Sequence, residues 1–227
     1  MNHHPVAHTP VRQFLDAIAD PDVFSGGGSV AAVAGAGAAA TALLVLRLNA
    51  KRKRNAPHMD GIDDGIDRLT GLVDHLLKAA DEDIATLQRL LEAQRVSKGT
   101  GDLKQYADVL QQAAASPVAI AESIGDLLAV VVPQLEITTR FTVSDLGAAA
   151  VLAEGAARAA LLTSEVNIAL LRDLPEPPVE AIQTLELRLR TIRHAVIDLA
   201  ERIERTSRGM IHQHALSGDA PAEDLAS

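Results

Sequence analysis

The chain has 227 residues, of which 48% are hydrophobic and only 2% aromatic, with a formal net charge of −9 and no cysteine. A core of this size built from alanine and aliphatic residues favours packed helices over a β-sandwich. The negative charge excludes general nucleic-acid affinity. The lack of cysteine excludes disulfides, thiolate nucleophiles and cysteine-ligated metals. No metal or organic cofactor is implied.

The first ten residues have neither a basic start nor an apolar core, so we expect a disordered tail rather than a signal peptide, and a cytoplasmic protein. The same tail explains His3, His4 and His8 better than a metal-binding tract does. Apolar residues at helical spacing then predict a helix over residues 11–19.

A glycine run, Ser25-Gly26-Gly27-Gly28-Ser29, leads into an uncharged stretch of small residues from Val30 to Leu46. We predict a glycine loop with Ser29 as the N-cap of a central buried helix, whose free N–H groups and dipole suit an anion or a polar ligand. A tight turn between two helices is the alternative. The run matches no nucleotide-binding fingerprint. The stretch is close to the minimum length of a membrane span, but it is too rich in alanine and glycine to favour one.

Amphipathic spacing predicts further helices over residues 60–94, 103–115, 117–136, 144–172 and 179–214. Pro117 begins one of them, Pro133 kinks it, and Ser144-Asp145 caps the next. We expect loops over 97–101 and 173–178 and a disordered tail over 215–227. The sequence therefore predicts an all-α, single-domain helical bundle over 11–214. Its alanine-rich helices favour close packing across a homodimer.

Two polar side chains interrupt apolar patterns. Asp83 lies among Ala80, Ile84 and Leu87, at the edge of an apolar helix face. Partial desolvation raises the pKa of such a carboxyl, which suits a general acid or base, whereas its neighbours Asp81 and Glu82 are expected to be solvated charges. Asn167 stands in an apolar run, where its amide needs a partner on another helix or on a ligand.

Several short motifs follow one another in a defined order: Gly26-Gly27-Gly28-Ser29, Lys51-Arg52-Lys53, Asp81-Glu82-Asp83, Glu92-Ala93-Gln94-Arg95, Ser116-Pro117-Val118, Ser144-Asp145-Leu146 and Val166-Asn167-Ile168. In this order they resemble the C-terminal family of formiminotransferase-cyclodeaminase, in its free-standing bacterial form. The resemblance covers roughly Val11 to Glu204 and implies an all-helical homodimer or higher oligomer.

The resemblance also implies a reaction of one-carbon tetrahydrofolates, either release of ammonia from the 5-formimino derivative or opening of the methenyl ring. It places Asp83 and Asp145 as catalytic or ligand-facing carboxylates. Substrate contacts are implied for Gly26, Gly27, Gly28, Ser29, Arg52, Lys53, Ser144 and Asn167, with the basic pair meeting the glutamate tail. From local pattern alone, Asp145 is equally typical of a helix start, and Lys51 to Arg54 are typical of cations at a helix C-terminus.

The chain departs from the family pattern at named positions. Serine stands for proline at Ser25, Ser97 lies in a stretch that is Leu-Pro-Lys in the family, and no arginine occurs around Asp102. Threonine replaces asparagine near Thr139 and at Thr163, and Glu165 is charged where the family is apolar. A diverged, non-catalytic member that binds a small ligand or its own kind is therefore the alternative function.

Overall fold

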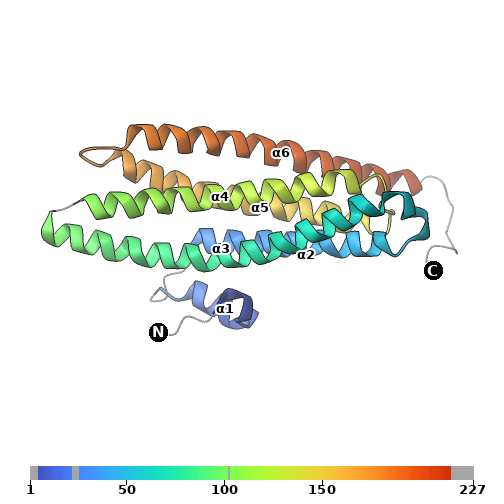
Figure 1. The fold of residues 1–227 in the computed structure, drawn as a ribbon, viewed down its shortest axis with the longest axis horizontal. Helices are drawn as coiled ribbons and strands as arrows, with labels where there is room; N and C mark the ends of the chain where they lie inside the picture. Colours follow the sequence, from blue (N-terminus) through green and yellow to red (C-terminus); the bar gives the residue numbers. More distant parts are fainter. Residues whose placement is uncertain (1–4, 22–25, 102, 216–227) are drawn as a thin grey trace.

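The computed structural model describes residues 5–21, 26–101 and 103–215, and this part of the chain is all-α, a single domain of six helices (Figure 1). The helices are α1 (Val11–Ala19), α2 (Gly27–Ala50), α3 (Met59–Thr100), α4 (Lys104–Gln134), α5 (Val143–Arg172) and α6 (Val179–Ala215). Short 3-10 turns, η1 (Val6–His8) and η2 (Lys53–His58), precede α1 and α3. The all-α prediction is confirmed.

The five long helices form one elongated bundle, in which α3, α4 and α6 face the viewer of Figure 1 and α2 and α5 lie behind them. Chain neighbours joined by short connections pack antiparallel. Helix α2 packs against its neighbour α3 and also against α5, and α4 packs against its neighbours α3 and α5 and also against α6. As a result α2 is covered on one side only. Its other side, beside α5, is the back of the bundle.

Several predicted boundaries differ from the structure, two of them at the ends of α2 and α3. Helix α2 begins at Gly27, so Ser29 lies inside the first turn and the N-cap is Gly26. The expected loop over 97–101 is the last turn of α3, where Ser97 Oγ and Thr100 Oγ1 donate to backbone oxygens of the same helix before Gly101 ends it with φ 77°. A stretch rich in serine, threonine and glycine is typical of a loop. It can nevertheless remain helical when its hydroxyl groups donate to carbonyl oxygens of the preceding helical turn.

Helix α4 runs without interruption through Pro117, where the sequence suggested two helices. A proline has no N–H, so the carbonyl of Ala113, four residues earlier, loses its partner in the helix. Asn167 Nδ2 of α5 donates to that oxygen at 2.8 Å, and Ser164 Oγ donates to Ala114 O at 2.7 Å. The neighbouring helix therefore repairs the break, and Asn167 has the interhelical partner that its apolar surroundings demand.

Close helix packing depends on glycines that receive large side chains. A Cβ on Gly125 would lie 2.7 Å from Ile192 Cδ1, and one on Gly65 would lie 2.6 Å from Leu46 Cδ2. Alanines fill most of the remaining α2 and α5 interface, and the core is completed by leucine, valine and isoleucine. The low aromatic content is thus matched by close packing of the helices at glycine and alanine positions.

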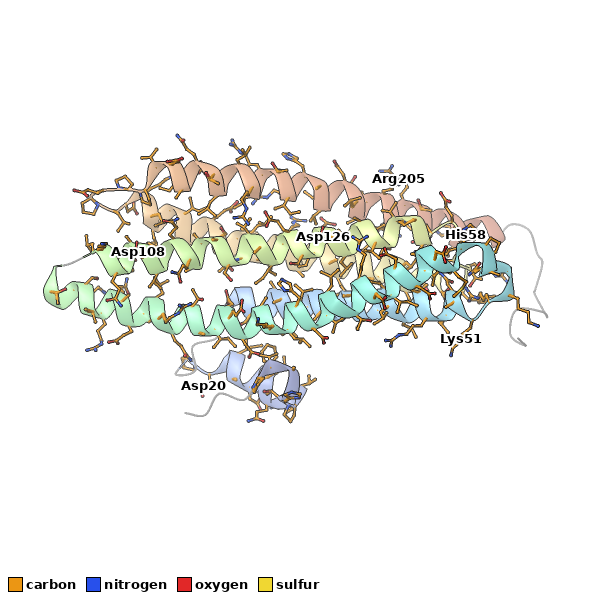
Figure 2. The ribbon with its side chains drawn as sticks, viewed as in Figure 1. Asp20, Lys51, His58, Asp108, Asp126 and Arg205 are labelled. Carbon is orange, nitrogen blue, oxygen red and sulfur yellow. The ribbon has the colours of Figure 1, made fainter. Side chains whose placement is uncertain are left out.

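Helices α2, α4 and α5 are long and apolar enough to cross a membrane by length and composition alone, and in the structure they are buried against one another in the bundle. Their outward sides differ. The exposed side of α4 carries charges such as Asp108 and Asp126 (Figure 2), whereas α2 has no charged residue from Gly27 to Leu46.

The exposed apolar residues of α2 and α5 form one surface at the back of the bundle, called the α2/α5 face. It consists of Val30, Ala34, Gly37, Ala40 and Leu44 on α2 and of Val151, Leu152, Gly155, Ala159, Leu162 and Val166 on α5. Leu162 and Val166 are 61% and 62% exposed. Contiguous apolar surface of this kind marks an interaction site.

Residues 5–10 were expected to belong to a disordered tail, and the structure instead describes them as a segment that contains the 3-10 turn η1. Val6 is buried against α3, and its N–H donates to Asp81 Oδ1 at 2.9 Å. Asp81 is therefore a structural partner and not the solvated charge that the sequence suggested. Helix α1 follows beside the bundle, with Val11 75% exposed (Figure 1). The expected tail over 215–227 lies outside the described residues, apart from Ala215 at the end of α6.

Candidate functional site

The Asp83 carboxyl lies against the first turn of α2. It accepts a hydrogen bond from the backbone N–H of Ser29, and it stands so close to Gly28 that a Cβ there would approach Cγ and Oδ2 to 2.7 Å. Asp83 itself is only 8% exposed and belongs to the middle of α3. A carboxylate at this place satisfies one of the N–H groups that a helix start leaves without a partner.

The glycines are needed for space and not for an unusual backbone. Within the described residues only Gly101 has a positive φ, so Gly27 and Gly28 adopt ordinary helical conformations. The absence of a side chain at Gly28 lets the Asp83 carboxyl reach the helix end. The predicted glycine loop that leaves this helix terminus free for an external anion is thus corrected, because the protein's own carboxyl already occupies part of it.

Ser29 is fully buried and donates from Oγ to Gly26 O at 2.8 Å, so its side chain closes the first turn instead of capping it. Its backbone N–H, directed at Asp83, carries the contact to the site. A Cβ added at Gly26 would lie 3.5 Å from Leu87 Cδ2 and 3.9 Å from Asp83 Oδ2. These residues surround Asp83 with apolar groups and one donor.

Two opposing effects set the ionisation of Asp83. Burial raises its pKa, because the charged form is separated from water, and the hydrogen bond from Ser29 lowers it by a smaller amount. The pKa of Asp83 is therefore raised above its ordinary value. A buried carboxyl whose pKa is raised in this way is a candidate general acid or base.

Helix α5 supplies the opposite wall. A Cβ on Gly27 would lie 3.1 Å from Thr163 Oγ1, so this hydroxyl faces the start of α2, and it also donates to Ala159 O of its own helix. Asn167 lies one turn further along α5, with its amide nitrogen bonded to α4. Asp83, Gly26 to Ser29 and Thr163 are called the carboxylate site.

The remaining sequence-predicted residues gather elsewhere. Arg52 and Lys53 follow the C-terminus of α2, and Ser144 and Asp145 lie in the first turn of α5. Both places are at the end of the bundle marked by Lys51 and His58 in Figure 2. These four residues are called the basic end. Helix α5 begins at Val143 and its N-cap is Thr142, so the prediction that Ser144 and Asp145 cap this helix is wrong.

The carboxylate site and the basic end are far apart within one chain. Asp145 and Thr163 are on the same helix, about 27 Å apart at the helical rise of ~1.5 Å per residue. Asp83 and Asp145, both predicted as catalytic, therefore do not meet in the monomer. On α2 the same rise separates Gly27 from Ala50, two residues before Arg52, by about 35 Å.

The positions where the chain departs from the family pattern fall in different surroundings. Thr163 lines the carboxylate site, and Thr139 is buried within 3.2 Å of Thr142 Oγ1 at the turn between α4 and α5. Ser97 is part of α3, and Ser25 and Asp102 lie outside the described residues. Sequence reasoning missed Asn49 and Thr138, which bond to each other in a buried network beside Arg52. The signal for it was an asparagine in an otherwise apolar helix end.

Comparison with known families matches residues 10–176 to formiminotransferase-cyclodeaminase. No curated protein matches the chain. Among solved structures, it is similar to formiminotetrahydrofolate cyclodeaminase from Thermotoga maritima, with 20% sequence identity and a TM-score of 0.79, over 91% of this chain and 99% of that one. At this identity the likeness shows the shared fold, while the family match spans most of the chain. The chain belongs to the formiminotransferase-cyclodeaminase family.

Proposed function

We propose that this protein acts in the cytoplasm on a one-carbon tetrahydrofolate, as a formimidoyltetrahydrofolate cyclodeaminase or a methenyltetrahydrofolate cyclohydrolase. The observation that carries the proposal is the buried Asp83 carboxyl held at the N-terminus of α2, with its pKa raised by burial. Family membership supplies the substrate class, and the carboxylate site supplies a group with suitable chemistry.

In cyclodeamination, N10 attacks the carbon of the protonated formimino group, and a new N10–C bond forms. N10 then gives its proton to the Asp83 carboxylate. The protonated Asp83 passes the proton to the amino group, the C–N bond breaks, and ammonia leaves the methenyl cation. Asp83 ends in its starting form. When water adds to the methenyl carbon, the same carboxyl removes one proton from that water and returns it to N5 as the C–N5 bond breaks. The remaining hydroxyl proton of the adduct passes to solvent as the formyl C=O bond forms.

The α2/α5 face supports a homodimer. The residues that define it are apolar and belong to two adjacent helices, and α2 carries no charged residue before the exposed Arg47 in its last turn. On α5, the exposed Arg158 beside this face pairs with Glu154. A two-fold axis perpendicular to α2 lays each α2 antiparallel to that of its partner. The carboxylate site of one protomer then faces the basic end of the other, which removes the separation of about 35 Å along α2.

In such a dimer, each composite site has a proton-transferring carboxyl at one end and cations at the other. Arg52 and Lys53 of the partner protomer meet the carboxylates of the glutamate tail, and Asp145 with Ser144 lies beside them. Planar guanidinium groups bind carboxylates well. We infer that Asp145 contacts the ligand and that Asp83 carries the proton chemistry.

The test of the catalytic role compares Asp83→Asn with Glu82→Gln. Both changes remove a carboxylate at nearly constant shape, but Glu82 is exposed and 3.6 Å from Lys78. Asp83→Asn is expected to lower turnover by a factor on the order of 10²–10⁴, and Glu82→Gln to leave it near the parent value. Methenyltetrahydrofolate absorbs in the near ultraviolet, so ring opening and formimino loss are both followed directly. Equal activity in all three proteins removes Asp83 from the mechanism.

The test of the dimer uses Leu162→Glu on the α2/α5 face and Leu187→Glu on α6 as its control, because both leucines are 61% exposed. Light scattering is expected to give a dimer for the parent and the control and a monomer for Leu162→Glu. A monomeric parent contradicts the dimer, and flotation of the parent with lipid vesicles assigns the face to a membrane.

A non-catalytic, ligand-binding member of the family is the second candidate. The observation in its favour is Thr163, a hydroxyl bonded to its own helix where the family pattern has an amide, at the wall of the carboxylate site. A parent protein that binds folate without any turnover of either substrate supports this candidate.

A further inference from the structure

A buried polar network lies at the C-terminus of α2, beside the basic end. Asn49 is fully buried, and its Nδ2 donates to Thr138 Oγ1 at 2.9 Å, while Thr138 donates to Gln134 O at 2.6 Å. On the other side of the same amide, Arg52 Nη1 donates to Asn49 Oδ1 at 2.8 Å. The Asn49 side chain thus links the turn after α4 to the guanidinium of Arg52.

The backbone at this point is fixed as well. The Asn49 carbonyl accepts from the Arg52 N–H at 3.1 Å and from Asn55 Nδ2 at 3.0 Å, and Asn55 also donates to Ile137 O at 3.4 Å. The turn that carries Arg52 is therefore attached to the C-terminal end of α4 by two buried asparagines. Burial of these amides is compatible with stability because each has partners.

The chemical identity of residue 49 matters for charge. An amide oxygen holds a guanidinium through a hydrogen bond without adding a negative charge, whereas an aspartate would form an ion pair and compete with any carboxylate of a ligand. The guanidinium is oriented by a neutral group that is itself anchored on the connection between α4 and α5. Such a contact orients the guanidinium and adds no charge of its own.

We propose that Asn49, anchored by Thr138, is a positioning residue that orients Arg52 toward a carboxylate of the ligand. The proposal rests on the proposed function, since it concerns the group that meets the glutamate tail. It assigns Asn49 no contact with the ligand, only the placement and charge of Arg52.

The test measures dissociation constants of 5-formyltetrahydrofolate with one and with three glutamates, by titration calorimetry, and takes their ratio for each variant. The ratio reports the tail contacts and does not depend on the fraction of active protein. Arg52→Gln is expected to reduce the preference for the triglutamate about tenfold, the size of one charge-assisted hydrogen bond. Asn49→Asp is expected to reduce it similarly, and Thr138→Val to reduce it less.

Asn49→Asp combined with Arg52→Gln is expected to show no further reduction, because both changes act through one guanidinium. A second measurement follows the Arg52 side-chain NH signals by nuclear magnetic resonance, where Thr138→Val is expected to speed rotation of the guanidinium. The proposal is overturned if Asn49→Asp keeps the parent preference for the triglutamate while Arg52→Gln loses it. If the parent binds no folate, the proposed function fails, and unchanged guanidinium motion in Thr138→Val refutes the positioning role independently.

Discussion

Replacement of Gly28 by alanine tests the geometry of the carboxylate site most directly. A Cβ at this position would meet the Asp83 carboxyl, with 2.7 Å to both Cγ and Oδ2, so the carboxyl has to leave the helix end. Gly28 has an ordinary helical backbone, and elsewhere in a helix the same change stabilises by up to about 1 kcal/mol. The sign of the effect therefore depends on Asp83 alone.

The expected loss of stability outweighs this gain. Displacement of the carboxyl forfeits a hydrogen bond from Ser29 worth about 1.5–3 kcal/mol, and overpacking costs about 1–3 kcal/mol. After the gain in helix propensity of up to about 1 kcal/mol, Gly28→Ala is expected to destabilise the fold by roughly 1.5–6 kcal/mol, combined from these ranges. A misplacement of the carboxyl by about 1 Å lowers turnover on the order of 100-fold.

Urea unfolding followed by circular dichroism, at equal protein concentration, measures the stability of this variant against two controls. Gly27→Ala meets only the Thr163 hydroxyl at 3.1 Å and is expected to cost little. Gly71→Ala, on α3 with no atom within 4 Å, is expected to stabilise by about 1 kcal/mol or less. If Gly28→Ala matches Gly71→Ala in stability and keeps full turnover, Asp83 does not lie over the start of α2.

Three further outcomes are expected. Folding raises the pKa of Asp83, so its contribution to stability is full at acid pH and is lost as the pH rises through the folded pKa. Asp83→Asn should therefore be more stable than the parent at pH 7, and the difference should close toward pH 4. A difference in urea unfolding that does not change with pH contradicts this expectation. Asp81→Ala should accelerate proteolysis near Val6 without moving the unfolding midpoint much, and unchanged cleavage would show that the hydrogen bond does not hold this segment. Glu122→Gln, at a half-exposed bidentate pair with Arg188, should cost about 1 kcal/mol or less in the same unfolding assay, and a larger loss would mean that the pair is shielded from water.

The predictable part of this protein follows from local pattern. Helical periodicity located the six α-helices, although it divided α4 at Pro117 and gave no sign of the 3-10 turns η1 and η2. The apolar flanks of Asp83 predicted partial desolvation, and the structure shows this side chain buried. The stretch from Ser97 to Gly101 was wrongly predicted as a loop, because its hydroxyl groups donate to carbonyl oxygens within the helix. A break at Pro117 was wrongly predicted because the effect of this proline depends on Asn167, which belongs to another helix.

The composition of the site was harder to predict for a different reason. The motifs at Asp83 and Asp145 look equivalent in the sequence, but long rigid helices place Asp83 in the middle of α3 and Asp145 at the basic end, far from it. Only the packing of α2 against α3 and α5 shows that Gly28 and Thr163 face the same space. The role of the glycines also required coordinates, since a missing side chain does not reveal which neighbour uses the room.

The glycine and alanine positions between the helices have a consequence for how this sequence can vary over time. At Gly65 and Gly125 the limit on a substitution is its volume, because Leu46 and Ile192 already fill the space above the backbone. Ser29 and Ser164 show that a small polar residue is accepted in the same interior once its hydroxyl finds a carbonyl. Selection on size leaves chemical identity free to drift at most other positions. A fold maintained by limits on residue volume can persist between two proteins that superpose with a TM-score of 0.79 although only 20% of their residues are identical.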